Sequence, residues 1–198
     1  GNGPNLVLIH GWGVNSGVWQ PISAQLEQLF SVTYIDLPGF GQNSKAFPET
    51  YSIEGVAADV ATVIPANSIV IGWSLGGLIA QQIALTKSAA IKQLILIATS
   101  PKFQKDDSWP GIAPTILSTF SLQLVQNLSK TIDRFLAIQA MGSQSAKTDM
   151  KKIKSSIEAY PQADIRALTA GLDILECVDL RPKLHTLTMP VHWMLGRL

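Results

Sequence analysis

The sequence predicts an α/β fold in which a doubly wound, mostly parallel sheet is interrupted late in the chain by a block of helices. Over the first 100 residues, short continuous apolar runs typical of buried parallel strands alternate with segments of helical spacing. Turns that contain Gly or Pro follow several of these runs. From Pro101 the apolar spacing is helical, and a strand is expected again only at Met189–Gly196. We therefore expect an α/β core over residues 1–100, a helical lid over 101–182 and a return to the core over 183–198.

The composition of the chain limits the classes of protein to which it can belong. At 198 residues, of which 46% are hydrophobic, it can bury one sizeable core. Its 15 basic and 14 acidic residues give a formal net charge of +1, which does not provide the basic surface of a nucleic-acid-binding domain. No apolar run approaches the ~18 residues of a membrane span. We expect a cytoplasmic monomer that binds neither nucleic acid nor membrane.

The single cysteine, Cys177, excludes an internal disulfide. It lies in a segment of helical spacing, and we expect it to be a small buried hydrophobic residue. One cysteine without a partner is compatible with a reducing cytoplasm.

The first strand is expected at Leu6–Ile9 and leads into the loop His10–Gly13. Apolar residues at spacings near four then predict a helix, at Val18, Ile22, Leu26 and Leu29. The next strand is expected at Val32–Asp36, followed by the exit loop Leu37–Gly41 with its proline and glycines. This order of strand, helix and strand is the start of a parallel sheet.

Ser52 is expected to cap a helix that leads into the central strand of the fold. The inner face of that helix is formed by Ile53, Val56, Ala57, Val60 and Val63. The strand Ile69–Ile71 follows, then the segment Gly72–Gly77, and then apolar residues at helical spacing. Ser74 is therefore expected on a sharp turn between strand and helix.

Ser74 lies in the pattern Gly-x-Ser-x-Gly, which is the nucleophile elbow of α/β-hydrolases. The strained turn points the hydroxyl away from the sheet, and Gly72 and Gly76 let strand and helix approach closely. Leu75 begins the helix, so its free backbone N–H and the positive end of the helix dipole face the place where an oxyanion would form. The alternative is a glycine-rich turn without a catalytic role. The strand before and the helix after favour the hydrolase interpretation.

The loop after the first strand is the second candidate part of the site. In hydrolases of this architecture it contains a His-Gly dipeptide, and the backbone N–H of the next residue, here Trp12, supplies the second oxyanion donor. In this fold the acid and the base follow the nucleophile in the chain, so His10 and Asp36 are expected to be structural. Ligands of doubly wound sheets bind beyond the carboxyl ends of the strands, where Trp12 and Ser74 are both expected.

After a strand at Gln93–Ala98, four helices are expected in the lid, at residues 115–127, 130–140, 146–159 and 165–177. The core face of the last helix is predicted at Ile165, Leu168, Leu172 and Leu175. Phe135 is the best candidate in the lid to contact a substrate, with a role in the lid's own core as the alternative.

One local charge pattern stands out on the lid. Lys130 and Arg134 are four residues apart, as are Lys147 and Lys151, so each pair shares a helix face. Such pairs either dock an acidic partner or form a solvated surface, and the interleaved Asp133 is compatible with the second interpretation.

Taken together, the motifs resemble those of the pimeloyl-[acyl-carrier protein] methyl ester esterases of biotin synthesis. The resemblance covers nearly the whole chain and rests on His10–Gly13, Asp36–Gly41, Gly72–Gly77, Trp109–Ile112, Arg134–Ala137 and Val178–Arg181. The first three segments are shared by many α/β-hydrolases, whereas Gly-Trp-Ser-Leu-Gly-Gly together with Arg-Phe-Leu-Ala is more particular. The resemblance implies a serine carboxylesterase that hydrolyses the methyl ester of a carrier-bound pimeloyl chain and releases methanol, with no metal or organic cofactor.

The resemblance also implies roles for individual residues. Ser74 is the nucleophile, and Trp12 and Leu75 form the oxyanion hole. Substrate contacts are implied at Trp12, Ser74, Leu75, Phe135, Leu136, Ala137, Ile138 and Gln139. Docking of the acyl-carrier protein is implied at Lys130, Arg134, Lys147 and Lys151.

The chain departs from the family pattern in its catalytic triad. The family's acid and histidine follow the last strand expected here, and neither is present. His185 lies in the connection that leaves the lid and His192 lies within a strand, so neither is placed where the base belongs. We expect a fragment, truncated at both ends, that hydrolyses esters very poorly by itself because an unassisted serine is a weak nucleophile.

Other functions of the same fold stay open. A broad short-chain carboxylesterase or a hydrolase of carbon–carbon bonds would use the same serine and oxyanion hole. A ligand-binding protein without catalytic activity would explain the absence of the triad partners without truncation.

Overall fold

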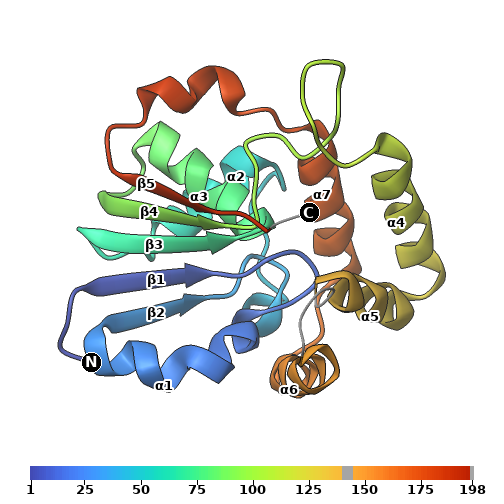
Figure 1. Cartoon of the computed structure of the whole chain (residues 1–198), viewed down its shortest axis with the longest axis horizontal. Helices are drawn as coiled ribbons and strands as arrows, with labels where there is room; N and C mark the ends of the chain where they lie inside the picture. Colours follow the sequence, from blue (N-terminus) through green and yellow to red (C-terminus); the bar gives the residue numbers. More distant parts are fainter. Residues whose placement is uncertain (140–144, 197–198) are drawn as a thin grey trace.

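The structure, a computed structural model, describes residues 1–139 and 145–196 and contains a five-stranded parallel sheet (Figure 1). The strands are β1 Asn5–Ile9, β2 Ser31–Ile35, β3 Ser68–Trp73, β4 Ile91–Ile97 and β5 Val191–Met194. Their spatial order is β2-β1-β3-β4-β5, and each neighbouring pair is parallel. The order reverses between β1 and β3, so the predicted doubly wound sheet is confirmed, with its switch point between these two strands.

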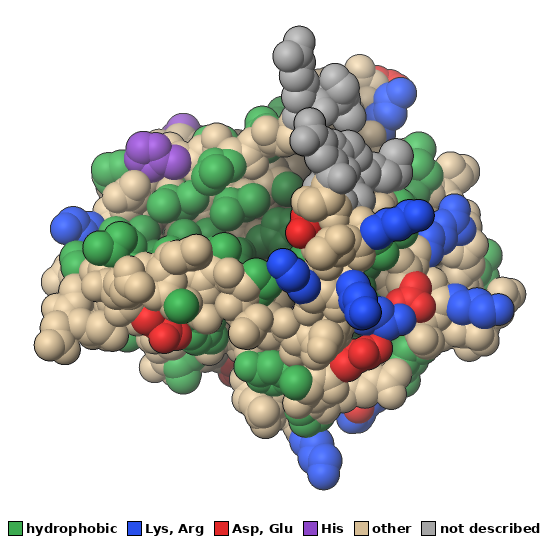
Figure 2. Space-filling view, turned by 60° about the horizontal axis from the view of Figure 1, so that its bottom comes forward, with side chains coloured by type: hydrophobic (Ala, Val, Ile, Leu, Met, Phe, Trp, Pro, Cys, Tyr) green, Lys and Arg blue, Asp and Glu red, His purple; other side chains and the backbone are tan. Residues whose placement is uncertain are grey.

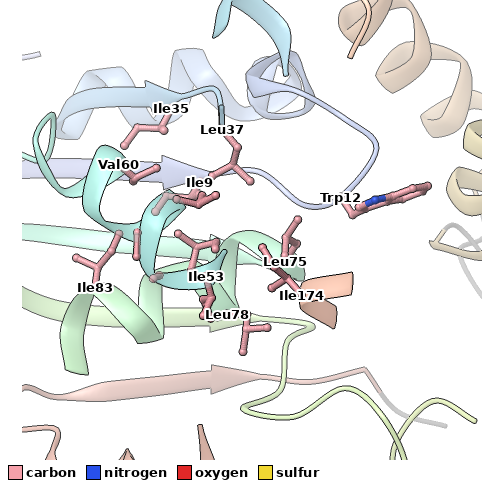
Figure 3. Packing of buried hydrophobic residues seen from close by; sticks show 14 of the residues in the cluster. Ile9, Trp12, Ile35, Leu37, Ile53, Val60, Leu75, Leu78, Ile83 and Ile174 are labelled. Carbon is pink, nitrogen blue, oxygen red and sulfur yellow. The ribbon is translucent and has the colours of Figure 1, made fainter. Parts of the chain in front are cut away.

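Helices cover both faces of the sheet (Figure 1). The helix α1 Gln20–Leu29 and the short 3-10 helix η1 Ser16–Trp19 lie on one face, where Leu26 and Trp19 pack against Leu8 of β1. The helices α2 Ile53–Ala61 and α3 Leu75–Thr86 lie on the other face and contribute many residues to the large core cluster. Figure 3 shows this cluster, with side chains such as Val60 and Ile83 packed together beside the strands.

The helix α2 forms where its cap and its apolar spacing predict it. The hydroxyl of Ser52 accepts a hydrogen bond from the N–H of Gly55 at 3.1 Å, which satisfies one of the free donors of the first turn. Its predicted inner residues Ile53, Val56, Ala57 and Val60 are buried. The prediction is wrong for Val63, which is 56% exposed, because the helix ends at Ala61 and the helical spacing no longer applies.

Among the described residues between β4 and β5 there are four α-helices, in the segment predicted as a lid, and all lie at the end of the sheet to which the arrows in Figure 1 point. They are α4 Pro114–Gln126, α5 Leu128–Gln139, α6 Ala146–Glu158 and α7 Ile165–Cys177. Each begins and ends close to its predicted position, although Ala140, the predicted end of the second, lies outside the described residues.

The helix α7 joins the lid to the core. Its residues Leu168, Leu172 and Leu175 are buried in the main cluster, as predicted. Two predictions about its ends are wrong. Ile165 is 43% exposed because it begins the helix, and Cys177 is exposed because it ends it, beyond the part of the helix that the core covers.

The entry and the exit of the lid lie side by side. Lys102, just after β4, forms an isolated antiparallel bridge with Asp179, just after α7. The N–H of Leu180 donates to the carbonyl of Pro101 at 2.9 Å. After this contact the chain forms the 3-10 helix η3 Arg181–Thr186 and returns to the sheet.

Within the described parts of the chain, no helix combines the length and the apolar character that crossing a membrane requires.

Candidate active site

Ser74 lies between β3 and α3 in a backbone conformation that few side chains adopt. Its φ is 52° and its ψ is −118°, so the residue has a positive φ without being glycine. Such a conformation persists only where the surrounding structure holds it. The N–H of Ser74 donates to the carbonyl of Ile97 at 3.0 Å, and its carbonyl accepts from the N–H of Gly77 at 2.9 Å. The predicted sharp turn between strand and helix is confirmed.

The glycines around Ser74 are required by close packing of backbone. A Cβ on Gly72 would lie 2.5 Å from the Cα of Gly77, and a Cβ on Gly76 would lie 2.5 Å from the carbonyl oxygen of Ile9. Both neighbours are backbone atoms and cannot move aside. The helix α3 therefore begins in direct contact with β3 and β1, which fixes the serine at the switch point of the sheet.

The loop after β1 passes directly against the serine. A Cβ on Gly11 would lie 3.3 Å from the Cβ of Ser74. The next residue, Trp12, is 1% exposed and extends away from the strands towards the lid (Figure 3). Its indole N–H donates to the carbonyl of Leu168 in α7 at 2.8 Å. Trp12 thus connects the loop of the core to the lid, and the structure brings Trp12 and Ser74 together as predicted.

The start of α3 and the loop after β1 are two backbone segments that adjoin Ser74. Leu75 is the first residue of α3, where an N–H has no acceptor within the helix and the helix dipole is positive. The loop that contains Trp12 also lies against the serine at Gly11. An arrangement of this kind can stabilise the oxyanion of a tetrahedral intermediate in acyl transfer.

His10 and Asp36 hold the surrounding loops, as expected. His10 is completely buried, accepts a hydrogen bond at Nε2 from the N–H of Leu37 at 3.0 Å and donates through Nδ1 to the carbonyl of Gly11 at 2.7 Å. Burial lowers the pKa of the imidazole, although the hydrogen bond to Gly11 and the charge of Asp36 partly oppose this. A neutral histidine with both nitrogens occupied by backbone groups is not available as a general base.

The carboxylate of Asp36 also hydrogen-bonds to backbone groups of the surrounding loops. Its carboxylate accepts hydrogen bonds from the N–H groups of Ser16 at 2.6 Å and Gln42 at 2.8 Å, which joins the loops after β1 and β2. Gly41 has a φ of 49°, and a Cβ there would overlap with the carboxylate. Asp36 is therefore a structural residue of the loop.

Ser74 lines a cavity of about 630 Å³ that is bounded by residues of the lid helices α4, α5 and α7. Its walls come from the core, from the loop between β4 and α4, and from α4, α5 and α7. They are formed by Trp12, Ser74, Ala98, Phe103, Lys105, Gly111, Ile112, Ala113, Ile116, Leu117, Phe120, Phe135, Ile138, Gln139, Leu172 and Leu175. The volume and the apolar lining fit a small organic substrate with an extended hydrocarbon part.

The lid residues predicted to contact substrate separate into two groups. Phe135 lines the cavity and lies edge-on to Trp12, with 5.4 Å between ring centroids, and Ile138 and Gln139 line it one turn further along α5. Leu136 and Ala137 do not line it. Leu136 is buried on another side of α5, and Ala137 is exposed to solvent, because consecutive residues of a helix point in different directions.

The four predicted docking residues, Lys130, Arg134, Lys147 and Lys151, are all exposed on α5 and α6. Figure 2 shows blue side chains gathered over this side of the molecule, with red ones between them. Arg134 donates to the side chain of Gln123 on α4 at 2.9 Å, and its guanidinium lies 5.8 Å from the centroid of the Phe120 ring. This arginine therefore lies beside Phe120, which lines the cavity.

The remaining histidines do not reach the serine. His185 in η3 and His192 in β5 are both exposed, and neither lines the cavity. Among residues 1–139 and 145–196 no group of three or more His, Cys, Asp or Glu side chains could hold a metal ion. The described part of the site thus brings Ser74 and Trp12 together at one cavity, with Leu75 beginning the helix directly after the serine.

Two residues of the site, Lys105 and Thr99, were not predicted from the sequence. Lys105 lines the cavity from a loop without periodicity. Thr99 donates its hydroxyl to the carbonyl of Ser74 at 2.7 Å and packs against Gly77. Its place directly after a predicted strand at the active-site end of the sheet was the one available indication.

A family model described as alpha/beta hydrolase fold matches residues 4–174 of the chain. Among solved structures, an esterase from Exiguobacterium antarcticum superposes with a TM-score of 0.84 over 98% of this chain and 73% of that one, at 23% identity. A hydrolase from Oleispira antarctica gives a TM-score of 0.81 over 98% and 72%, at 22% identity. At these identities the two structures support the fold.

Relatives of known name are more similar in sequence. The pimeloyl-[acyl-carrier protein] methyl ester esterase of Pseudoalteromonas atlantica is 69% identical over all of this chain, which covers 77% of that protein. The protein of the same name from Aeromonas hydrophila is 44% identical, again over the whole chain and 78% of its own length. The chain therefore belongs to the α/β-hydrolase fold family and, within it, to the pimeloyl-[acyl-carrier protein] methyl ester esterases.

Proposed function

We propose that this protein is a serine carboxylesterase that hydrolyses the methyl ester of pimeloyl-[acyl-carrier protein] and so supplies the free pimeloyl carboxylate for biotin synthesis. The observation that supports this most directly is Ser74, held at a positive φ directly before α3 and lining an apolar cavity. The names of relatives that are 69% and 44% identical support the choice of substrate.

In the proposed reaction, the Oγ of Ser74 attacks the carbonyl carbon of the methyl ester while a general base takes its proton. The negative charge on the carbonyl oxygen is stabilised by the N–H groups of Trp12 and Leu75. The tetrahedral intermediate collapses, the base returns the proton to the leaving methoxide, and methanol departs. Water then attacks the acyl-enzyme by the same route, which releases the carboxylate and restores the serine.

We propose that the histidine and the acid of the triad lie outside the 198 residues. His10 is locked in its loop, and His185 and His192 lie away from the cavity. The chain covers about three quarters of the relatives named above, so the relatives contain further residues. The 198-residue chain by itself would then hydrolyse esters slowly, because the oxyanion hole and substrate binding alone retain only a small part of the rate enhancement.

The substrate would enter with its methyl ester at Ser74 and its hydrocarbon chain along Phe135, Ile138 and Gln139. The carrier protein would dock on the exposed cations Lys130, Arg134, Lys147 and Lys151. Three of the four are lysines, which provide charge without the planar fork of arginine, so this docking would depend strongly on ionic strength. We further propose a cytoplasmic monomer that binds neither nucleic acid nor membrane.

The test is hydrolysis of pimeloyl-carrier methyl ester by the full-length protein, beside a plain short-chain methyl ester and a Ser74→Ala control. A strong, Ser74-dependent preference for the carrier-bound ester is the expected result. Turnover of the plain ester alone would support the esterase activity but contradict the role in biotin synthesis. Binding of the ester without turnover by the protein with Ser74 intact would favour a ligand-binding protein of this fold.

A further inference from the structure

Lys105 is the one charged residue, within the described sequence, that lines the Ser74 cavity. The other lining residues are apolar or small except for Ser74 itself and Gln139. A cation in such a cavity is costly if it is buried, but Lys105 is exposed. Its aliphatic stem therefore lies along the wall while the ammonium group stays in water at the mouth.

The position of Lys105 is fixed by its backbone. The N–H of Lys105 donates to the carbonyl of Ile112 at 2.9 Å, and the N–H of Ile112 donates to the carbonyl of Phe103 at 2.7 Å. These two bonds close residues 103–112 into a narrow loop along the cavity wall. The next residue, Asp106, is held by the side chains of Lys102 at 2.5 Å and Arg181 at 3.1 Å. Lys105 thus projects from an anchored segment.

The ammonium group of Lys105 has no salt bridge with any described residue. Its acidic neighbour Asp106 already interacts with two other cations. Lys105 thus places a positive charge without an acidic partner at the mouth of an otherwise apolar cavity. Such a charge is suited to bind an anionic group on the part of a ligand that extends out of the cavity.

We propose that Lys105 is a specificity-determining residue that binds an anionic oxygen group on the part of the substrate remote from the ester. This inference rests on the proposed function, because it takes Ser74 as the place of the ester. The anion has two possible sources. It is the carboxylate of a free dicarboxylic half-ester, or it is the phosphate of the prosthetic arm that joins the acyl chain to the carrier.

The experiment uses two matched pairs of small substrates with the full-length protein. Monomethyl pimelate is compared with dimethyl pimelate, and methyl pimeloyl-phosphopantetheine with methyl pimeloyl-pantetheine. Each pair differs only in the anionic group. The variants are Lys105→Met, which keeps an unbranched stem without charge, and Lys105→Arg, which keeps the charge. Lys92→Met is the control, because Lys92 is exposed at the start of β4, at the opposite end of the sheet.

In Lys105→Met, the ratio of kcat/KM for the anionic over the neutral member of one pair should fall about fivefold, mainly through KM. Lys105→Arg should restore most of the ratio, and Lys92→Met should leave it at the wild-type value. A fall in the first pair alone identifies the carboxylate, and a fall in the second pair alone identifies the phosphate. Unchanged ratios in both pairs would overturn the inference.

Calorimetric binding to the Ser74→Ala protein, with and without Lys105→Met, separates this inference from the proposed function. If the wild-type protein hydrolyses none of the four esters but Lys105 still favours the anionic ligands, the proposed function fails and the anion site stands. If the esters are hydrolysed but binding is independent of Lys105, the function stands and the anion site fails.

Discussion

The side-chain hydroxyl of Thr99 donates a 2.7 Å hydrogen bond to the backbone carbonyl of Ser74. Thr99 is buried directly after β4, and Ser74 has the positive φ of the elbow. The strained residue is therefore held by a side chain from the neighbouring strand as well as by its own helix. This relationship leads to the first of four predictions.

Thr99→Val should destabilise the protein by about 1 kcal/mol, because a nearly isosteric side chain removes one hydrogen bond from a buried carbonyl. The kcat for a methyl ester should fall as well, since the elbow is held less tightly. Urea unfolding and initial rates on the full-length protein measure both effects. Thr99→Ser is the control that keeps the hydroxyl, and a Val variant that is as active and as stable as the wild type would contradict the prediction.

Gly76→Ala should destabilise the protein by about 3 kcal/mol. The new Cβ would meet the carbonyl oxygens of Ile9 and His10, which belong to β1 and its exit loop and cannot move without disturbing the sheet. Gly196→Ala is the matched control, because a Cβ there meets no atom of the described residues within 4 Å. Denaturant midpoints of the two variants should differ clearly, and equal midpoints would show that α3 can shift away from β1.

Stability should fall with decreasing pH below about 6.5, the ordinary pKa of an unfolded histidine. Burial lowers the pKa of His10 in the folded state, so below this pH the unfolded chain binds a proton that the folded protein does not. The stabilisation by neutral His10 is thus complete above pH 6.5 and is lost as the pH falls towards the lowered value.

Urea unfolding between pH 5 and pH 8 measures this dependence. His10→Gln is the comparison, because its side-chain oxygen can accept the hydrogen bond from Leu37 and does not titrate. The variant should be less stable than the wild type at pH 8 and should show a smaller slope between pH 5 and pH 6.5. If the wild type and His10→Gln show the same slope of stability against pH, the pH dependence comes from other titratable groups.

Arg181→Lys should loosen the loop that contains Lys105. The guanidinium of Arg181 forms two short bonds with Asp179 at the exit of the lid and also reaches Asp106 at its entry, whereas lysine cannot bind both in this way. Hydrogen exchange of the amides of residues 103–112 should become faster while the amides of the sheet stay unchanged.

Arg166→Lys is the control for this experiment. Arg166 binds Asp164 through the same two donor atoms, at 3.0 and 2.9 Å, but that pair is local to the start of α7. Equal acceleration of residues 103–112 in both variants would show that the ionic contacts of Arg181 do not hold the loop.

Much of the fold could be predicted because the relevant signals are local. The strands before and after Ser74 are short β-branched runs, and the lid helices follow apolar spacing, so their positions come from the sequence within a few residues. The elbow was predictable because the backbones of its strand and helix approach so closely that only glycine fits at positions 72 and 76. The pattern of glycines around Ser74 is therefore visible in the sequence. Residues at the ends of helices, such as Val63 and Cys177, were placed wrongly because periodicity does not show where the core ends.

The part of the site that could not be predicted depends on contacts between distant segments. Lys105 and Thr99 lie in loops, where no repeat spacing shows which way a side chain points. The contact of Arg181 with Asp106 joins residues 75 positions apart, and nothing in either segment specifies the other. For the segment Phe135–Gln139, the sequence predicted the helix but not which of its side chains face the cavity. That orientation depends on the packing of Leu136 on another side of the helix.

The bridge between Lys102 and Asp179 has an evolutionary consequence. Because the lid leaves and re-enters the core at neighbouring points, exchanging the whole insertion for another of different length would change the closure entropy of the chain only slightly. The serine, its glycines, Trp12 and Leu75 belong to segments outside that insertion, so they would be inherited unchanged. A lineage, or an engineer, could thus acquire a new acyl pocket in one step while keeping the same chemistry.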